Sequence, residues 1–346
     1  MRATTVGIIS IGDMGLGIAK LLQSHGFRVV TVTQGRSEHT LTRIRAAAIE
    51  AFPSDHELVV QADYILSIVP PRNAFVTAER VAEACRQPET QSQRELLEDV
   101  NGQPGRSPLY FLELNATPAR SAEETAALFQ TQTQTQTQDQ DQDQDQTPRR
   151  SVPNIFLDGG IIGAPPTQRP DGSWKKPSVV VSGTVENPTP ATFTELARAL
   201  NVKVVSERIG AASTLKLTFA ALTKGLTALS ILSFSTAERE AVLPELLAHL
   251  DEYSPATAGL ARSGVVGMSP KAYRWEEEMR GIGETLDREG GWDGVGERVY
   301  GGIAEIYRTV AEETILGQER VGQRERGTSV EDAAQIIAGR KDYKGG

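Results

Sequence analysis

The sequence of 346 residues contains a single cysteine, Cys85. One cysteine excludes an intrachain disulfide framework and a thiolate metal cluster, and it is typical of a protein from a reducing compartment. The four histidines are scattered along the chain without the spacing that metal ligands require. We therefore expect no metal site, and we assign the histidines no catalytic task.

Blocks of basic residues and long apolar runs are also lacking. The chain carries 36 lysines and arginines against 45 aspartates and glutamates, a formal net charge of -9. It has no basic cluster to provide the positive surface that a nucleic-acid backbone requires. No uninterrupted apolar run approaches the roughly 18 residues needed to cross a bilayer, and the N-terminus lacks the basic lead and cleavage site of a secretory leader. We expect a globular, cytoplasmic protein that binds a small-molecule substrate, with no nucleic-acid and no membrane partner.

Strands and helices alternate along the first 208 residues. Residues 6–11 form an apolar run rich in branched side chains, a glycine turn follows, and the next segment fits a helix that stops at Gly26. A second strand at 27–33 precedes a helix with Ser37 as its N-cap. The pattern predicts an α/β fold of the Rossmann type, with a doubly wound and mostly parallel sheet. Further strand-like runs occupy 64–70, 109–116, 154–162, 178–183 and 202–206.

Two polar intervals interrupt this pattern, near 86–107 and 130–150. The second contains a glutamine-aspartate repeat at 130–146, with no side chain that could join a core. Segments of this composition stay mobile, so both intervals are predicted to be insertions. Expansion of a tolerated surface loop explains the repeat. Its use as a metal- or partner-binding segment would require aspartates on a floppy chain to converge at a large entropic cost.

The character of the chain changes after Gly210. Residues 211–242 contain one glycine, no proline and many leucines and alanines, which predicts a long and largely buried helix. The segments beyond it also have helical patterns. We therefore predict a nucleotide-binding domain at 1–208 and an all-helical domain at 209–346 for substrate binding and dimerisation. The apolar surface of the helical domain favours a homodimer.

The stretch IISIGDMGLG at 8–17 lies between the first predicted strand and the first predicted helix. At such a turn, backbone N–H groups and the helix dipole attract a pyrophosphate. A Cβ at Gly12 would collide with the phosphate, and Gly15 lets the helix pack on the strand. Ser10 stands where the first glycine of a G-x-G-x-x-G fingerprint is usual, a position where a small residue suffices. We predict a dinucleotide site whose pyrophosphate lies on the turn formed by Gly12, Asp13, Met14 and Gly15.

The end of the second predicted strand distinguishes the two nicotinamide cofactors. An acidic residue about twenty positions after the glycine turn would bind the ribose 2′-OH of NAD, but the chain there is VTVTQGRS at 30–37. Gly35, Arg36 and Ser37 place a guanidinium and a hydroxyl just before a helix start, which suits the 2′-phosphate of NADP. NADP is therefore the predicted cofactor, and NAD is the alternative. On the alternative interpretation, Arg36 is a solvated loop residue and Ser37 is only a helix cap.

Five stretches in a fixed order resemble the β-hydroxyacid dehydrogenase and 6-phosphogluconate dehydrogenase superfamily. They are VGIISIGDMGLGIAKLL (6–22), SIVPP (67–71), LNATP (114–118), DGGIIGAPP (158–166) and GAASTLKLTFAALTKG (210–225). The similarity is greatest to the NAD-binding, phosphogluconate dehydrogenase-like branch that has its own C-terminal helical domain, and it covers nearly the whole chain apart from the two insertions. It implies a nicotinamide-dependent oxidoreductase and strengthens the expectation of a homodimer.

The resemblance also implies roles for particular residues. It makes Lys216 the general acid/base, which is chemically sensible because an ammonium in a dry cleft can supply a proton and stabilise a developing oxyanion. It places Val69, Pro70 and Asn115 near the nicotinamide. The substrate-binding positions that it implies are Thr117, Ile162, Gly163, Ala164, Ala220 and Thr223, of which the last two share one side of a helix with Lys216.

Three departures from the family pattern bear on the substrate. Ala220 replaces the asparagine that generally holds the substrate hydroxyl, and Ile162 stands where a serine often holds a carboxylate. The short LNATP loop leaves either Asn115 or Thr117 as the group that holds the substrate. Because so few polar groups remain, 6-phosphogluconate itself does not suit the pocket.

We predict an NADP-dependent oxidoreductase that acts on a small hydroxyacid or a related carbonyl compound. One alternative is an imine reductase, for which an apolar pocket is an advantage. The other is a non-catalytic NADP-binding sensor.

Overall fold

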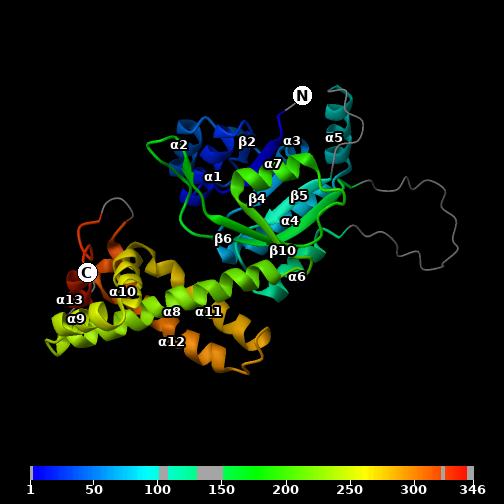
Figure 1. Cartoon of the computed structure of the whole chain (residues 1–346). Helices are drawn as coiled ribbons and strands as arrows, with labels where there is room; N and C mark the ends of the chain where they lie inside the picture. The colour runs from blue at the N-terminus through cyan, green and yellow to red at the C-terminus, as the bar shows by residue number, and fades with distance from the viewer. Residues whose placement is uncertain (1–2, 101–107, 131–150, 321–323, 341–346) are drawn as a thin grey trace. The chain divides into compact units, whose positions relative to one another are not determined.

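The computed structural model describes the chain except for residues 1–2, 101–107, 131–150, 321–323 and 341–346 (Figure 1). It divides into two compact units, Met1–Lys216 and Leu217–Gly346. The division falls inside the long helix α8 (Ala211–Arg239), whereas the sequence placed it at residue 208, before that helix.

The first unit is built on a sheet whose strand order is β10-β9-β6-β5-β4-β1-β2-β3. Figure 1 labels β2, β4, β5, β6 and β10 of this sheet. The described pairs are parallel except for β6 and β9, which are antiparallel. This order confirms the predicted doubly wound, mostly parallel fold. The strands are β1 (Thr5–Ile9), β2 (Arg28–Val32), β3 (Glu50–Phe52), β4 (Tyr64–Ser67), β5 (Leu109–Glu113), β6 (Asn154–Ile162), β9 (Ser178–Ser182) and β10 (Val202–Ser206). A small separate hairpin consists of β7 (Thr167–Gln168) and β8 (Trp174–Lys175).

Successive strand residues enter two different cores, as alternation along a strand requires. Ile8 belongs to a core that also contains residues of α1 and α7, whereas Ile9 belongs to a core with residues of α3 and α4. Most side chains that the central strands contribute to the two cores are apolar. The helices of this unit are α1 (Asp13–Ser24), α2 (Glu38–Ala46), α3 (Asp55–Gln61), α4 (Ala74–Arg86), α5 (Pro88–Val100), α6 (Ala119–Ala127) and α7 (Ala191–Leu200).

The prediction that the interval 86–107 is a mobile insertion is wrong for its first part. Helix α5 (Pro88–Val100) lies in this interval and packs on α3. The buried Arg94 fixes α5 by donating to the carbonyl oxygens of Val59 and Ala62, at 2.6 and 2.7 Å. A hydrophobic pattern does not reveal a helix held by such side-chain to backbone bonds. Of the second interval only Gln130 is described, and the glutamine-aspartate repeat otherwise lies outside the described residues.

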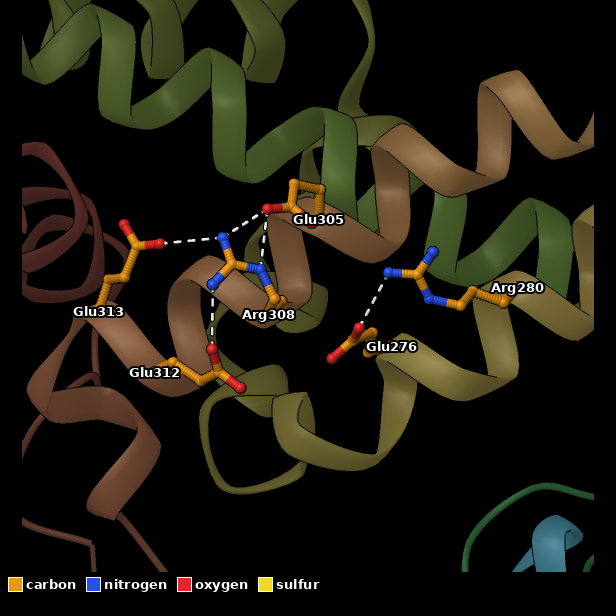
Figure 2. A network of polar contacts seen from close by, with 6 residues as sticks. All are labelled: Glu276, Arg280, Glu305, Arg308, Glu312 and Glu313. Atoms are coloured by element: carbon orange, nitrogen blue, oxygen red, sulfur yellow. Dashed lines mark hydrogen bonds and ion pairs between the residues drawn. The ribbon is translucent and has the colours of Figure 1, made fainter.

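The second unit is largely helical in its described part, in agreement with the helical region that the sequence predicted. A Cβ on Gly296 would lie 2.6 Å from the carbonyl oxygen of Gly283, so these glycines let α11 and α12 approach closely. On α12, Arg308 pairs with Glu305, Glu312 and Glu313, and on α11 Arg280 pairs with Glu276 (Figure 2). Besides the rest of α8, the helices are α9 (Leu243–Tyr253), α10 (Pro255–Met268), α11 (Ala272–Arg288), α12 (Val295–Glu313) and α13 (Val330–Ala338).

Among the described residues, α8 is the one helix that is long and apolar enough by composition to cross a membrane. This property is not evident as an unbroken apolar run in the sequence, because serine, threonine and lysine interrupt α8. Of the apolar 18-residue stretch of α8, 50% is buried inside the protein. We therefore regard α8 as a partly buried core helix of a dehydrogenase-like fold.

Candidate functional site

The glycine turn lies at the carboxyl end of β1 and begins α1. Gly12 is the N-cap, and no side chain caps the N–H groups of the first turn. A Cβ at Gly12 would meet nothing nearer than the Ser10 hydroxyl at 4.0 Å, so the space in front of the helix N-terminus is open. A Cβ at Gly15 would lie 2.1 Å from the carbonyl oxygen of Ser10. The turn thus combines close helix packing at Gly15 with exposed amides that can bind a phosphate.

Ser10 has a φ of 81°. This is the left-handed region, which costs a residue with a Cβ roughly 1–2 kcal/mol. The sequence analysis required only a small residue at this position, and the structure corrects that view because the turn demands the backbone conformation of glycine. Serine adopts it under strain, so the altered fingerprint keeps the geometry of the usual one.

The residues after β2 hold an arginine with an unused donor. Arg36 is half-buried, and its Nε is buried with no hydrogen-bond partner in the described part of the chain. Burial lowers the pKa of Arg36, the neighbouring Arg80 lowers it further, and Asp55 opposes the shift. Arg36 is therefore less solvated than the alternative interpretation assumes, and its binding of a 2′-phosphate stays a prediction. Gly35 has a φ of 69°, which suits the turn that leads to Arg36.

Two neighbours complete the charge balance near Arg36. Asp55 binds Arg80 through both carboxylate oxygens, at 2.8 Å to Nε and 3.0 Å to Nη2. Two guanidinium groups therefore share one carboxylate, which leaves a surplus of positive charge at this end of β2. The sequence did not single out Arg80 or Asp55, because their pairing depends on α3 meeting α4. Ser37 accepts the N–H of Thr40 and so caps α2 as predicted.

Asn115 links the loop after β4 to the end of β5. Its side chain is buried, its Oδ1 accepts the N–H of Val69 at 2.7 Å, and its Nδ2 donates to the Ser67 hydroxyl at 3.2 Å. The structure thus brings Val69, Pro70 and Asn115 together at the carboxyl edge of the sheet, and their contact with a nicotinamide stays a prediction. The Asn115 amide is already engaged in these bonds, so its role is to hold the Val69–Pro70 loop.

Thr117 differs from Asn115 in having an unused polar group. It is 7% exposed, and its hydroxyl has no hydrogen-bond partner in the described part of the chain. A buried hydroxyl without a partner is costly unless a ligand or water satisfies it. Of the two candidates that the sequence left open, Thr117 is therefore the one whose hydroxyl remains available to a substrate.

Lys216 lies over the same edge of the sheet. A Cβ built on Gly160 would lie 2.9 Å from the Cβ of Lys216 and 3.1 Å from that of Ala116. Gly160 in turn forms a β-bridge with Asn115. The side-chain stem of Lys216 therefore rests on β6 beside the Asn115–Thr117 segment, and the lysine is half-buried there. Gly160 stands within the stretch DGGIIGAPP, but no local pattern distinguishes it from the other glycines there.

The remaining substrate positions are less closely gathered. Ile162 is half-buried and lies two residues beyond Gly160 on β6, so its side chain is on the same face as the position that Lys216 covers. Gly163 and Ala164 follow it and are exposed. Ala220 and Thr223 belong to the second unit, where Ala220 is buried and Thr223 is exposed and donates to its own helix. Their part in substrate binding stays a prediction.

Two buried carboxyl groups support this edge, and the sequence analysis missed both. Asp158 accepts the N–H of Ser213 at 3.0 Å and the hydroxyls of Ser213 and Ser182, and these bonds fix the first turn of α8 on the sheet. Burial raises the pKa of Asp158, while hydrogen bonds from Ser213, Ser182 and Gly210 lower it. The one available signal was an acid in the middle of an apolar strand.

Glu113 is the second buried carboxyl group. Its Oε1 accepts the backbone N–H of Asn115 at 3.1 Å and also a bond from the Asn115 side chain. Burial first, and then the neighbouring Asp158, raise the pKa of Glu113 from 4.5 to about 8, against the hydrogen bonds from Asn115. A carboxyl group with this environment is uncharged over most of the neutral range.

Comparisons with known proteins agree with this architecture. Residues 5–91 match the family model described as NADP oxidoreductase coenzyme F420-dependent, and residues 237–310 match a domain of unknown function, DUF1932. No functionally curated protein matches the sequence.

Three solved structures are similar over most of the chain. A conserved protein of unknown function, described as structurally similar to 3-hydroxyacid dehydrogenases, has 20% sequence identity and a TM-score of 0.57, covering 89% of this chain and 97% of that one. A 3-hydroxyisobutyrate dehydrogenase of Mycobacterium tuberculosis has 14% identity and a TM-score of 0.60, with 97% and 98% covered. That of Salmonella typhimurium has 17% identity and a TM-score of 0.58, with 96% and 99% covered.

At these identities the similarity shows the fold. The chain has the fold of 3-hydroxyacid dehydrogenases, with an N-terminal NAD(P)-binding Rossmann unit and a largely helical C-terminal region. The predicted resemblance and fold class are confirmed.

Proposed function

We propose that the protein is an NADP-dependent oxidoreductase that transfers a hydride between nicotinamide and a small hydroxyacid or a related carbonyl compound. The observation that carries this proposal is the position of Lys216 over Gly160, beside Asn115 and Thr117. These residues lie at the carboxyl ends of β5 and β6, and ligands of doubly wound sheets bind at that edge.

The residues present fit a nicotinamide dinucleotide. The uncapped amides after Gly12 would hold the pyrophosphate, and the unused donor of Arg36 would hold the 2′-phosphate. Asp13, the acid nearest this turn in sequence, pairs with Arg43 at 3.0 Å, which reduces its repulsion of a phosphate. When bound, the cofactor supplies or accepts the hydride.

The chain itself supplies the proton. In the reducing direction, a hydride adds to the carbonyl carbon while the Lys216 ammonium gives a proton to the carbonyl oxygen, and oxidation of the alcohol reverses both transfers. An ammonium in a site that excludes water also stabilises negative charge on that oxygen more strongly than one in bulk water would. The hydroxyl of Thr117, which has no hydrogen-bond partner among the described residues, would supply a neighbouring contact for a polar substrate group.

An imine reductase on the same fold is the second candidate. The observation that favours it is the half-buried Ile162, an apolar side chain on the strand face that Lys216 covers. An iminium carbon accepts hydride without needing a strong proton donor, and an apolar wall suits such a substrate. Loss of the ammonium would then impair turnover only weakly.

Assays of NADPH consumption with keto acids, aldehydes and cyclic imines test these candidates. For the first, Lys216→Ala should lower kcat at least about 100-fold, in the range of lost general acid catalysis, while NADPH affinity is retained. A small loss confined to imine substrates would favour the second candidate. No substrate-dependent oxidation at all would favour a non-catalytic NADP-binding sensor.

The assembly and location that we propose are a cytoplasmic homodimer formed through the helical region. The support for the homodimer is an exposed apolar stripe on α8, whose residues are spaced at three, four and seven positions and therefore share one side of the helix, and which a monomer would leave in water. The stripe consists of Leu215, Phe219, Leu222, Leu229 and Leu232.

A further inference from the structure

Glu113 and Asp158 are direct neighbours across the sheet, at matching positions of β5 and β6. Both are 0% exposed. Ser67, the neighbour of Glu113 on β4, is uncharged, and Lys216 on α8 lies over Gly160, two residues beyond Asp158. Two carboxylates so placed repel each other without the screening of water, so ionising both is strongly unfavourable.

The hydrogen bonds decide which of the two carries the charge. Asp158 accepts from the N–H and hydroxyl of Ser213 and from the hydroxyl of Ser182, so donors surround both of its oxygens. Glu113 accepts from Asn115 through Oε1 alone, and its buried Oε2 has no hydrogen-bond partner in the described part of the chain. The donors therefore stabilise a negative charge on Asp158 better than one on Glu113, so Glu113 is the carboxyl group that keeps its proton.

We propose that Glu113 is a positioning residue that works in its neutral, protonated form. It holds Asn115 and, through Asn115, the Val69–Pro70 loop. The ionised Asp158 beside it holds the turn of α8 that leads to Lys216. One buried proton thus keeps both the Val69–Pro70 loop and Lys216 in place. This inference rests on the function proposed for the loop and the lysine.

The proposal implies that this arrangement is lost at high pH. Because burial and Asp158 raise the pKa of Glu113 to about 8, the proton leaves above that pH. The second negative charge then opposes Asp158, and either the Asn115 loop or the first turn of α8 must give way or admit water. NADPH binding should weaken as a result.

The test compares wild type with Glu113→Gln and Glu113→Met in fluorescence titrations of NADPH at pH 7 and pH 9.5. Wild type should lose about tenfold in affinity between the two values, since each pH unit beyond the pKa allows up to a tenfold change. The glutamine keeps the acceptor for Asn115 and cannot ionise, so its affinity should change much less. The methionine offers no oxygen and should bind NADPH more weakly at both values.

Glu124→Gln is the matched control, because Glu124 is exposed on α6 and pairs only with Arg120 among the described ion pairs. It should keep the wild-type profile. The proposal is overturned if Glu113→Gln retains the pH dependence of wild type, or if Glu113→Met binds as Glu113→Gln does.

Thermal unfolding of the cofactor-free protein tests the buried proton without any ligand. Glu113 holds its proton in the folded state up to about pH 8 but loses it above about pH 4.5 once unfolded, so wild type loses stability as pH rises through this window. Glu113→Gln lacks this loss, and its Tm should rise relative to wild type between pH 5 and pH 8. A constant difference would overturn the proposal. Failure of wild type to bind NADPH or NADH would instead refute the proposed function and leave this readout intact.

Discussion

The side-chain stem of Lys216 rests directly on the main chain of Gly160. A Cβ at that glycine would lie 2.9 Å from the Cβ and 3.0 Å from the Cγ of the lysine. Both distances are too short for carbon atoms, so the absence of a side chain on β6 determines where Lys216 can lie. Gly160 also forms a β-bridge with Asn115. Thr117 follows Asn115 by two residues in the chain.

Gly160→Ala should therefore displace Lys216. We expect kcat to fall at least about tenfold, because small misplacements of a catalytic group carry losses of this order or more, while NADPH affinity changes little. Steady-state kinetics and fluorescence titration measure the two effects. Gly259→Ala is the control, since a Cβ at Gly259 meets nothing within 4 Å. An unchanged kcat in Gly160→Ala would show that the proton does not come from Lys216.

Arg36 should set the preference for NADP. Arg36→Ala removes a half-buried guanidinium with an unused Nε donor, and a lost hydrogen bond to a charged group costs about 1.5–3 kcal/mol, or roughly 10- to 100-fold in affinity. NADPH binding should weaken by this factor and NADH binding should not. Arg45→Ala is the control, because Arg45 is exposed on α2 and pairs with Glu38. Equal losses for both cofactors would refute the assignment of the 2′-phosphate to Arg36.

Ser10→Gly should stabilise the protein. Serine at a φ of 81° carries backbone strain that glycine relieves, and the expected gain is up to about 1 kcal/mol after the greater chain entropy of unfolded glycine is subtracted. Thermal unfolding measures the gain. Ala48→Gly relieves a similar conformation, at a φ of 48°, outside the glycine turn and should give a comparable gain. A loss of stability in Ser10→Gly alone would mean that the serine hydroxyl contributes more than the strain removes.

The sequence predicted the strands of the central sheet because their apolar runs are short and separated by turn residues. Gly26 and Ser37 were recognised for the same kind of local reason, and the structure shows Gly26 at a φ of 82° and Ser37 as an N-cap. Strand β3 escaped prediction because its three residues, Glu50 to Phe52, are not buried and carry no apolar pattern.

The buried polar contacts of the site could not be predicted in the same way. Glu113 and Asp158 are each visible as an acid in an apolar strand, but their pairing depends on the register of β5 and β6. The contact of Lys216 with Gly160 depends on where α8 crosses β6, some 56 residues apart in sequence. Only the family resemblance, which rests on the order of the motifs, predicted that Lys216 belongs to this site.

The exposed apolar stripe of α8 leads to a prediction about assembly. Leu222 is 77% exposed, and burying such a side chain is worth about 1.5–3 kcal/mol. Leu222→Glu should place a charge in the proposed interface and shift the protein toward a monomer of 37.4 kDa in size-exclusion chromatography with light scattering, whereas wild type should elute at twice that mass. Leu260→Glu is the matched control, because Leu260 is an exposed leucine on α10 and not on the stripe. A dimer that survives Leu222→Glu but not Leu260→Glu would move the interface from α8 to α10. A monomeric wild type at micromolar concentration would refute the homodimer itself.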